Sequence, residues 1–188
     1  MKLQSDSPPR GNLWILTGPR GSGKTTLCLR LAAEARALDW DVAGVVSPAA
    51  FDGPDKTAIE VMDLRSGESR RFARRPVNSE ANPSNHTGWV FDQMVLVWGN
   101  EVLANAVPCD MLIVDEMGPL EFEAGRGWSA GLAAVDSRSY RVSLVTIRPE
   151  LLAVARQRWP FAGVVDMASP DSFLEPMEGQ TARKPGED

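Results

Sequence analysis

Residues 18–25 carry the pattern of a phosphate-binding loop. They read Gly-Pro-Arg-Gly-Ser-Gly-Lys-Thr, which matches G-x-x-x-x-G-K-[ST]. Glycines let the backbone curl so that successive amides point inward at phosphate oxygens. A helix that begins at Lys24 adds its unpaired N–H groups and the positive end of its dipole. We therefore expect this loop to bind the phosphates of a nucleoside triphosphate.

The positions of this loop have different expected roles. Gly21 and Gly23 lie where a side chain would intrude on the phosphates. Lys24 is expected to reach the β- and γ-phosphates and to assist catalysis, and the Thr25 hydroxyl to ligate the Mg²⁺ that bridges them. Arg20 occupies a variable position and is expected to face outward. The predicted nucleotide-binding residues are Gly18, Pro19, Arg20, Gly21, Ser22, Gly23, Lys24, Thr25 and Thr26.

Two adjacent carboxylates follow the apolar segment 111–114. Asp115 and Glu116 should lie at the carboxyl end of a buried strand, where ligands bind in open α/β sheets. Asp115 fits the role of holding magnesium, usually through a water molecule. Glu116 fits the role of polarising the water that attacks the γ-phosphate. Asp-Glu pairs also occur at strand ends simply because the chain there reaches solvent. This prediction therefore depends on the phosphate loop upstream.

A glutamate directly after the magnesium aspartate resembles the ATPase-like division of P-loop proteins more than the simple kinases. In that division, which has a RecA-like strand order, another strand separates the loop strand from the acidic strand. Residues 142–147 are available for that place. We hypothesise that Thr146 or Arg148, near its end, senses or stabilises the transferring phosphoryl group. An exposed arginine at a strand end is the alternative interpretation of Arg148.

The elements that must position these residues alternate between apolar strands and helices. Strands are expected at 13–17, 42–46, 111–114, 142–147 and 163–167, and a possible added β-hairpin at 58–64 and 69–73. Helices are expected from Lys24, at 92–105, around 128–135 and at 150–159. The first helix is predicted from an apolar stripe at Leu27, Leu31, Ala35 and Leu38. This alternation predicts an α/β fold of the P-loop NTPase type, with a mainly parallel sheet covered by helices on both faces.

Length and composition place the chain among ordinary folded domains. Its 188 residues are 43% hydrophobic and 24% charged, which excludes disordered, collagenous and membrane classes. We expect residues 13–174 to form a single domain. Residues 1–12 and 175–188 are rich in proline, glycine and charge, and we expect them to be flexible tails.

Several classes of partner are disfavoured. No apolar run reaches the ~18 residues of a membrane span, and the first residues lack a signal-peptide core, so we expect a cytoplasmic protein. Two cysteines and one histidine leave no basis for disulfide or zinc chemistry. The net charge of -5 argues against a nucleic-acid-binding face, and we interpret the basic run 70–75 as a solvated strand edge or loop. His86 lies in a polar stretch, 78–87, interpreted as a loop over the nucleotide.

Four segments together resemble a known family, the small P-loop nucleoside-triphosphatases first described from thermophiles, with cancer-related relatives in animals. They are the loop 18–25, the strand 42–46, the segments 88–92 and 98–100, and the run Val-Asp-Glu-Met-Gly-Pro-Leu-Glu at 114–121. The resemblance implies slow, Mg²⁺-dependent hydrolysis of several nucleoside triphosphates to diphosphate and phosphate, with loose base selectivity. The family commonly has lysine where this chain has Pro119, and His-Arg where it has Arg148-Pro149. Catalysis here is therefore expected to be weaker or to draw on an arginine.

Hydrolysis of nucleoside triphosphates is the leading hypothesis, and two others remain open. A nucleoside or small-molecule kinase would need an arginine-rich lid, which residues 70–75 could supply. A nucleotide-dependent switch or assembly module would bind nucleotide with little turnover. No motif identifies a base pocket, an interface or a protein partner.

Overall fold

The motif-bearing segments lie in and around one mixed sheet. The computed structural model describes residues 11–76 and 88–169. The strands are β1 (Asn12–Thr17), β2 (Val42–Val46), β3 (Ala49–Asp52), β4 (Asp55–Asp63), β5 (Ser69–Arg74), β6 (Val90–Phe91), β7 (Cys109–Met117), β8 (Tyr140–Ile147) and β9 (Gly163–Asp166). The helices are α1 (Lys24–Arg36), α2 (Gln93–Ala104), α3 (Pro119–Phe122), α4 (Ser129–Ser137) and α5 (Leu152–Arg158), the last preceded by the 3-10 turn η1 (Pro149–Leu151).

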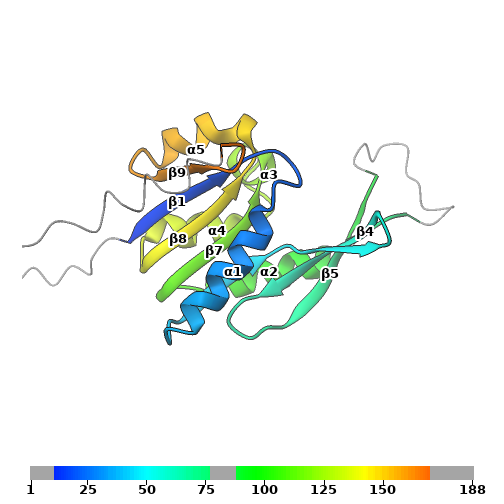
Figure 1. Ribbon diagram of the computed structural model, residues 1–188, viewed down its shortest axis with the longest axis horizontal. Helices are drawn as coiled ribbons and strands as arrows, with labels where there is room; N and C mark the ends of the chain where they lie inside the picture. Colours follow the sequence, from blue (N-terminus) through cyan, green and yellow to red (C-terminus); the bar gives the residue numbers. More distant parts are fainter. Residues whose placement is uncertain (1–10, 77–87, 170–188) are drawn as a thin grey trace, which may run out of the picture.

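The strand order is the ATPase-like one predicted from the acidic pair. It runs β6-β5-β4-β2-β7-β8-β1-β9, with β3 paired to β4 outside this path. The strands from β2 to β9 in this order are parallel, whereas β4 pairs with β2 in the antiparallel direction. Figure 1 shows β8 between β1 and β7, so the carboxyl ends of the loop strand and the acidic strand flank that of β8.

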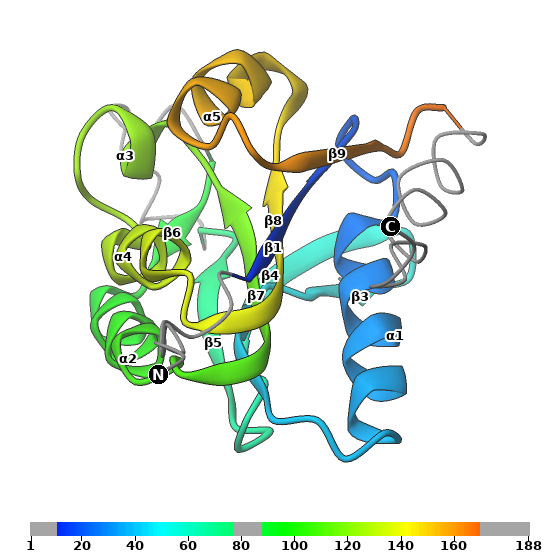
Figure 2. The same cartoon turned by 90° about the vertical axis from the view of Figure 1, so that its left-hand side faces the viewer.

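Helices cover both faces of the sheet, as predicted. Figure 2 shows α1 on one side and α2 and α4 on the other. Buried side chains accordingly form two main clusters, one that includes α1 with Leu16, Val46 and Ile113, and one that includes α2, α4 and α5 with Ile15 and Val114. Neighbouring residues of β1 and β7 thus contribute to opposite faces, as expected of strands buried on both sides.

The buried face of α1 matches the predicted stripe only in part, at Ala35 and the partly buried Leu27. Its buried residues are Cys28, Ala32 and Ala35, while Leu38 lies beyond the helix end and is 69% exposed. Small side chains let the helix axis approach the sheet closely, and a stripe of large residues would hold it away. Cys28 is a packing residue, and burial raises the pKa of its thiol, which keeps it protonated and unreactive.

The predicted β-hairpin is present and larger than expected. β4 and β5 pair around the turn near Gly67, and β3 and β6, which were not predicted, extend the sheet on either side. These short strands expose Phe51 and Phe91, so they lack the apolar alternation by which a strand is recognised. The basic run lies largely on β5, where Arg70 and Arg71 are exposed and pair with Glu68 and Glu60. Arg70 and Arg71 are therefore solvated, as interpreted, whereas Phe72 and Ala73 of the same run pack inward.

The limits of the domain are described only in part. β1 begins at Asn12, one residue before the expected start of the domain. Residues 1–10 and 175–188 of the predicted tails lie outside the described residues, and so does the stretch around His86. Among the helices of the described ranges, none combines the length and the apolar character that crossing a membrane requires.

Candidate functional site

The loop between β1 and α1 surrounds the ammonium group of Lys24. Lys24 Nζ donates to the carbonyl oxygens of Gly18 at 2.7 Å and Pro19 at 2.9 Å, and it lies 3.4 Å from Ser22 Oγ. The loop backbone thus bends around one cation. A lysine held in this way is placed where phosphate groups enter the loop.

The glycines of this loop adopt conformations that other residues avoid. Gly18, Gly21 and Gly23 have φ values of 143°, 79° and 89°. Gly23 is also the N-cap of α1, and no side chain caps the helix. The first N–H groups of α1 therefore remain available to an anion, as the sequence predicts for a phosphate site.

Asp115 is fully buried at the end of β7, and its carboxylate accepts three hydrogen bonds. Oδ2 accepts from Thr25 Oγ1 at 2.8 Å and from the Ser47 backbone N–H at 3.0 Å, while Oδ1 accepts from Thr146 Oγ1 at 2.6 Å. The structure therefore brings together three predicted residues from α1, β7 and β8. The Ser47 contact was not predicted, because a backbone N–H after a strand has no signal in the side-chain sequence.

Glu116 leaves the strand direction at a bulge. Its φ is 63°, and the pairing of β7 with β8 changes register between Val114 and Met117. Its backbone N–H donates to Thr146 Oγ1 at 2.7 Å, and that hydroxyl in turn donates to Asp115. A bulge re-aims a side chain away from the regular pleat. The neighbouring carboxylates consequently differ: Asp115 is enclosed and Glu116 faces solvent.

Desolvation is the largest influence on Glu116, and it shifts the pKa in the direction that favours action as a base. Partial burial removes water from around the Glu116 carboxyl group and raises its pKa. The negative charge of Asp115 acts in the same direction. The positive charges of Lys56, Arg148 and Arg20 oppose this shift. A raised pKa makes the carboxylate a better proton acceptor, which general-base catalysis near neutral pH requires.

Thr146 and Arg148 occupy different environments. Thr146 is buried, and its hydroxyl links Asp115 to the backbone of Glu116. Arg148 is exposed just after β8, near enough to Glu116 for its charge to lower that group's pKa. Their predicted contact with a phosphoryl group stays a prediction. The observed contacts show that Thr146 also holds Asp115 and the backbone of Glu116 in position.

The sequence analysis missed a cluster on the added hairpin. Lys56 of β4 is half-buried, with Nζ 5.6 Å from the centroid of the Trp89 ring, and Arg75 stacks on the same ring at 4.5 Å. The positive charge of Lys56 lowers the pKa of Glu116, and the negative charge of Glu116 raises the pKa of Lys56. The only signal for it in the sequence was a lysine shortly after the turn residues Gly53 and Pro54, which is too common a feature to predict a site.

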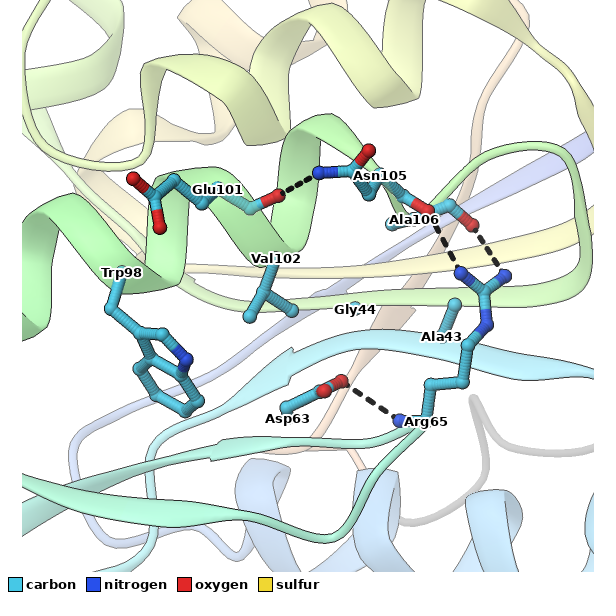
Figure 3. Close-up of a pocket in the computed structure, with 9 residues that line it drawn as sticks. All are labelled: Ala43, Gly44, Asp63, Arg65, Trp98, Glu101, Val102, Asn105 and Ala106. Carbon is cyan, nitrogen blue, oxygen red and sulfur yellow. Dashed lines mark hydrogen bonds between the residues drawn. The ribbon is translucent and has the colours of Figure 1, made fainter.

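Two of the hollows on the described surface bear on the site. One, of about 450 Å³, adjoins the phosphate loop and is lined by Gly23, Thr26, Leu27, Arg30 and Met167. The other, of about 320 Å³, lies between α2, β2 and the turn that follows β4, and Figure 3 shows Arg65 at its side. There Arg65 donates to both carboxylate oxygens of Asp41 and to the carbonyls of Asn105 and Ala106. None of the predicted site residues lines this second hollow, and Arg65 ties the hairpin to the end of α2.

Comparison with known proteins agrees with this geometry. A family described as NTPase has a model that matches residues 14–158, a span that includes the loop and the acidic pair. The chain belongs to this family. It is 30% identical over 121 residues to nucleoside-triphosphatase THEP1 of Pyrococcus abyssi, covering 59% of this chain and 61% of that protein. It is 27% identical over 145 residues to THEP1 of Pyrobaculum islandicum, covering 76% of this chain and 77% of that protein.

Two solved structures share the fold. A human cancer-related nucleoside triphosphatase superposes with a TM-score of 0.68 at 22% identity, covering 93% of this chain and 100% of that chain. THEP1 from Aquifex aeolicus superposes with a TM-score of 0.56 at 18% identity, covering 91% and 99%. The P-loop NTPase fold predicted from the sequence is thereby confirmed.

The Asp115→Asn variant of this NTPase-family protein is expected to lose both stability and ligand response. An amide nitrogen cannot accept the bonds that Asp115 accepts, so the free energy of unfolding should fall by about 1–3 kcal/mol. On the expectation that Asp115 supports Mg²⁺, stabilisation by Mg²⁺ and ADP should also fall. Urea unfolding with and without Mg·ADP measures both effects.

Asp110→Asn, at the amino end of β7, should keep the Mg·ADP response. An unchanged response in Asp115→Asn would contradict the metal role.

Glu121 has a structural role close to the site. It is buried, and its carboxylate accepts the backbone N–H groups of Gly118 at 2.7 Å and Trp128 at 2.6 Å. Glu121→Gln can satisfy only one of these donors, so the free energy of unfolding should fall by about 1–3 kcal/mol. The exposed Glu123→Gln should change it by less than about 0.5 kcal/mol. Equal urea unfolding curves for the two variants would rule this role out.

Proposed function

We propose that the chain is a Mg²⁺-dependent nucleoside-triphosphatase that hydrolyses the bond between the β- and γ-phosphates, giving diphosphate and phosphate. The observation that carries the proposal is the connection of Thr25, Asp115 and Glu116 through Thr146 beside the phosphate loop. Binding alone would need only the loop. A second, outward-facing carboxylate held next to the metal aspartate adds a group for activating water. The printed names of the relatives, nucleoside-triphosphatase, agree with this proposal.

The donor atoms fit magnesium. The Thr25 hydroxyl and the Asp115 carboxylate are hard oxygen ligands, and they lie 2.8 Å apart. No group of three or more His, Cys, Asp or Glu side chains in the described residues could hold a metal alone. Magnesium suits such a site because it keeps several waters and shares its coordination with substrate phosphates. Thr25 and Asp115 would hold the ion, which neutralises charge on the phosphates.

Other groups of the chain bind the phosphates, activate the water and hold the acidic pair in position. The loop amides and Lys24 hold the β- and γ-phosphates, so that the γ-phosphorus is fixed in front of the acidic pair. Glu116 orients a water molecule and accepts its proton as the new O–P bond forms and the bond to the diphosphate breaks. Thr146 keeps Glu116 and Asp115 in a fixed relation throughout.

Loose base selectivity and a slow rate are parts of the same proposal. The hollow beside Gly23 offers Leu27 and Met167 as apolar walls and Arg30 as a cation, which can contact the flat face of any base. Pro119 begins α3 and brings no charge to the segment after the acidic pair, which is consistent with modest catalysis. A cytoplasmic location also belongs to the proposal, and it is supported by two unpaired cysteines.

The two alternatives make different products. In a kinase the basic run would form a lid, but Arg70 and Arg71 are engaged with Glu68 and Glu60 on β5, which weighs against it. Product analysis of ATP, GTP, CTP and UTP, with and without candidate acceptors, tests the proposal. Magnesium-dependent phosphate release without an acceptor, at comparable rates for the bases, is the expected result. Transfer only to an acceptor, or tight binding without turnover, would contradict it.

A further inference from the structure

The hollow between α2, β2 and the turn after β4 has the size and composition of a pocket for a small molecule. Its volume of about 320 Å³ lies within the range of roughly 300–1,000 Å³ that ligand pockets occupy. Its apolar walls are Ala43 and Gly44 of β2, and Trp98, Val102 and Ala106 on α2 or just after it. A few polar groups lie among these walls, as is usual where a ligand must be held in one orientation.

The arginine at the edge of this hollow already has partners within the protein. Arg65 donates to both carboxylate oxygens of Asp41 and to the backbone carbonyls of Asn105 and Ala106. The charge of Asp41 therefore compensates that of Arg65, and most of the guanidinium N–H groups are engaged. An anion that entered the hollow would find few free donors on Arg65.

A second arginine beside the hollow is compensated in the same way. Arg70 of β5 pairs with Glu68 at 2.7 Å, and its guanidinium carbon lies 4.3 Å from the centroid of the Trp98 ring. This contact shows that the electron-rich face of the Trp98 ring is used to hold a cation. Neither arginine thus brings an unpaired positive charge to the hollow.

One carboxylate of the hollow is bonded only to uncharged donors in its own turn. Asp63 accepts hydrogen bonds from the backbone N–H of Arg65 at 2.9 Å and from the hydroxyl group of Ser66 at 2.6 Å. Asp41 has the largest effect in raising the pKa of Arg65, and the negative charge of Asp63 adds a smaller one. Asp63 therefore keeps most of its negative charge for another partner.

The other carboxylate of the hollow, that of Glu101, makes no ion pair or hydrogen bond in the described part of the chain. It lies three residues after Trp98, so the two side chains are neighbours on the surface of α2. Figure 3 shows Asp63 across the hollow from α2, with Trp98 and Val102 directed toward it from the helix. The hollow thus combines apolar and aromatic walls with an excess of negative charge.

We propose that this hollow binds a small organic cation, namely a primary amine carried on a flat or apolar body. The ammonium group is held by Asp63 and Glu101, and the body packs against Trp98 and Val102. Carboxylates offset the charge of such a ligand, while the apolar walls remove its body from water. The inference is independent of the proposed function, because none of the residues predicted to bind nucleotide lines this hollow.

The test uses three indoles that share a flat body and differ in charge. Tryptamine is a cation, tryptophol is neutral and indole-3-acetate is an anion. The indole N–H signal of Trp98 in a proton–nitrogen NMR spectrum, assigned by its loss in Trp98→Phe, should shift saturably with tryptamine. The Kd for tryptophol should be about tenfold higher, because the charge-assisted bonds are lost. Indole-3-acetate should bind more weakly still.

A matched pair of variants locates the ammonium group. Glu101→Gln removes an exposed carboxylate, so the fold should be retained, and the Kd for tryptamine should rise about three- to tenfold toward that of tryptophol. The Kd for tryptophol should stay unchanged in this variant. Glu34→Gln removes an exposed carboxylate on α1, which covers the other face of the sheet, and should alter neither Kd.

Four results would overturn the inference. One is the absence of a saturable shift of the Trp98 signal with tryptamine. Another is equal affinity for tryptamine and tryptophol, which would describe an apolar hollow without preference for a cation. Tighter binding of indole-3-acetate would show that Arg65 or Arg70 governs the hollow. Unchanged tryptamine affinity in Glu101→Gln would remove the carboxylate from the site.

Discussion

Replacing Glu116 by glutamine is expected to slow phosphate release by about 10²- to 10⁴-fold while Mg·NTP binding is retained. The amide keeps the size of the side chain but cannot accept a proton from water. The hydrogen bond that positions this residue comes from its backbone N–H to Thr146, so the substitution leaves that contact in place. Steady-state phosphate release gives kcat, and titration with a fluorescent nucleotide gives the affinity.

Two further variants make the Glu116 result specific. Glu116→Asp keeps a carboxylate but shortens it by one carbon, so it should retain part of the activity. Glu150→Gln removes an exposed carboxylate shortly after Arg148 and should leave kcat unchanged. If Glu116→Gln turned over like the wild type, another group would have to activate the water.

Lys24→Ala is expected to weaken triphosphate affinity on the order of a hundredfold or more, because it removes charge-assisted bonds to two phosphates. The fold should be little affected. Among residues 11–76 and 88–169, the Lys24 ammonium bonds only within the loop, to the carbonyls of Gly18 and Pro19 and to Ser22, where water can replace it. Isothermal titration with Mg·ATP measures the loss, and urea unfolding measures stability.

Arg20 provides the comparison within the same loop. Its side chain is exposed, so Arg20→Ala should weaken triphosphate binding much less than Lys24→Ala. Equal effects of the two substitutions would mean that general positive charge, and not the position of Lys24 inside the loop, attracts the nucleotide.

The phosphate loop and the acidic pair were predictable because each is encoded in consecutive residues. The identity of Gly18, Gly23 and Lys24 fixes a local backbone path, and an apolar strand that ends in Asp115 and Glu116 fixes where the carboxylates emerge. The position of β8 between their strands followed from the adjacency of the two acidic residues. The structure places these residues together as the sequence analysis expected.

What the sequence did not indicate depends on contacts between distant segments. The buried face of α1 is set by how closely Ala32 can approach the sheet, which periodicity alone does not reveal. The backbone N–H of Glu116 donates to Thr146 Oγ1 at a bulge after Val114, where the pairing of β7 and β8 shifts. Lys56 and Trp89 are 33 positions apart in the numbering, and only the pairing of β4 through β6 brings them together.

The most direct test of the central claim measures nucleotide binding and phosphate release on the same preparations of the wild type, Glu116→Gln and Lys24→Ala, with Mg·ATP. If the loop and the acidic pair form one hydrolytic site, the wild type binds and releases phosphate, Glu116→Gln binds without appreciable release, and Lys24→Ala does neither. Undiminished release from both variants would contradict the account, because the hydrolysis would then arise elsewhere.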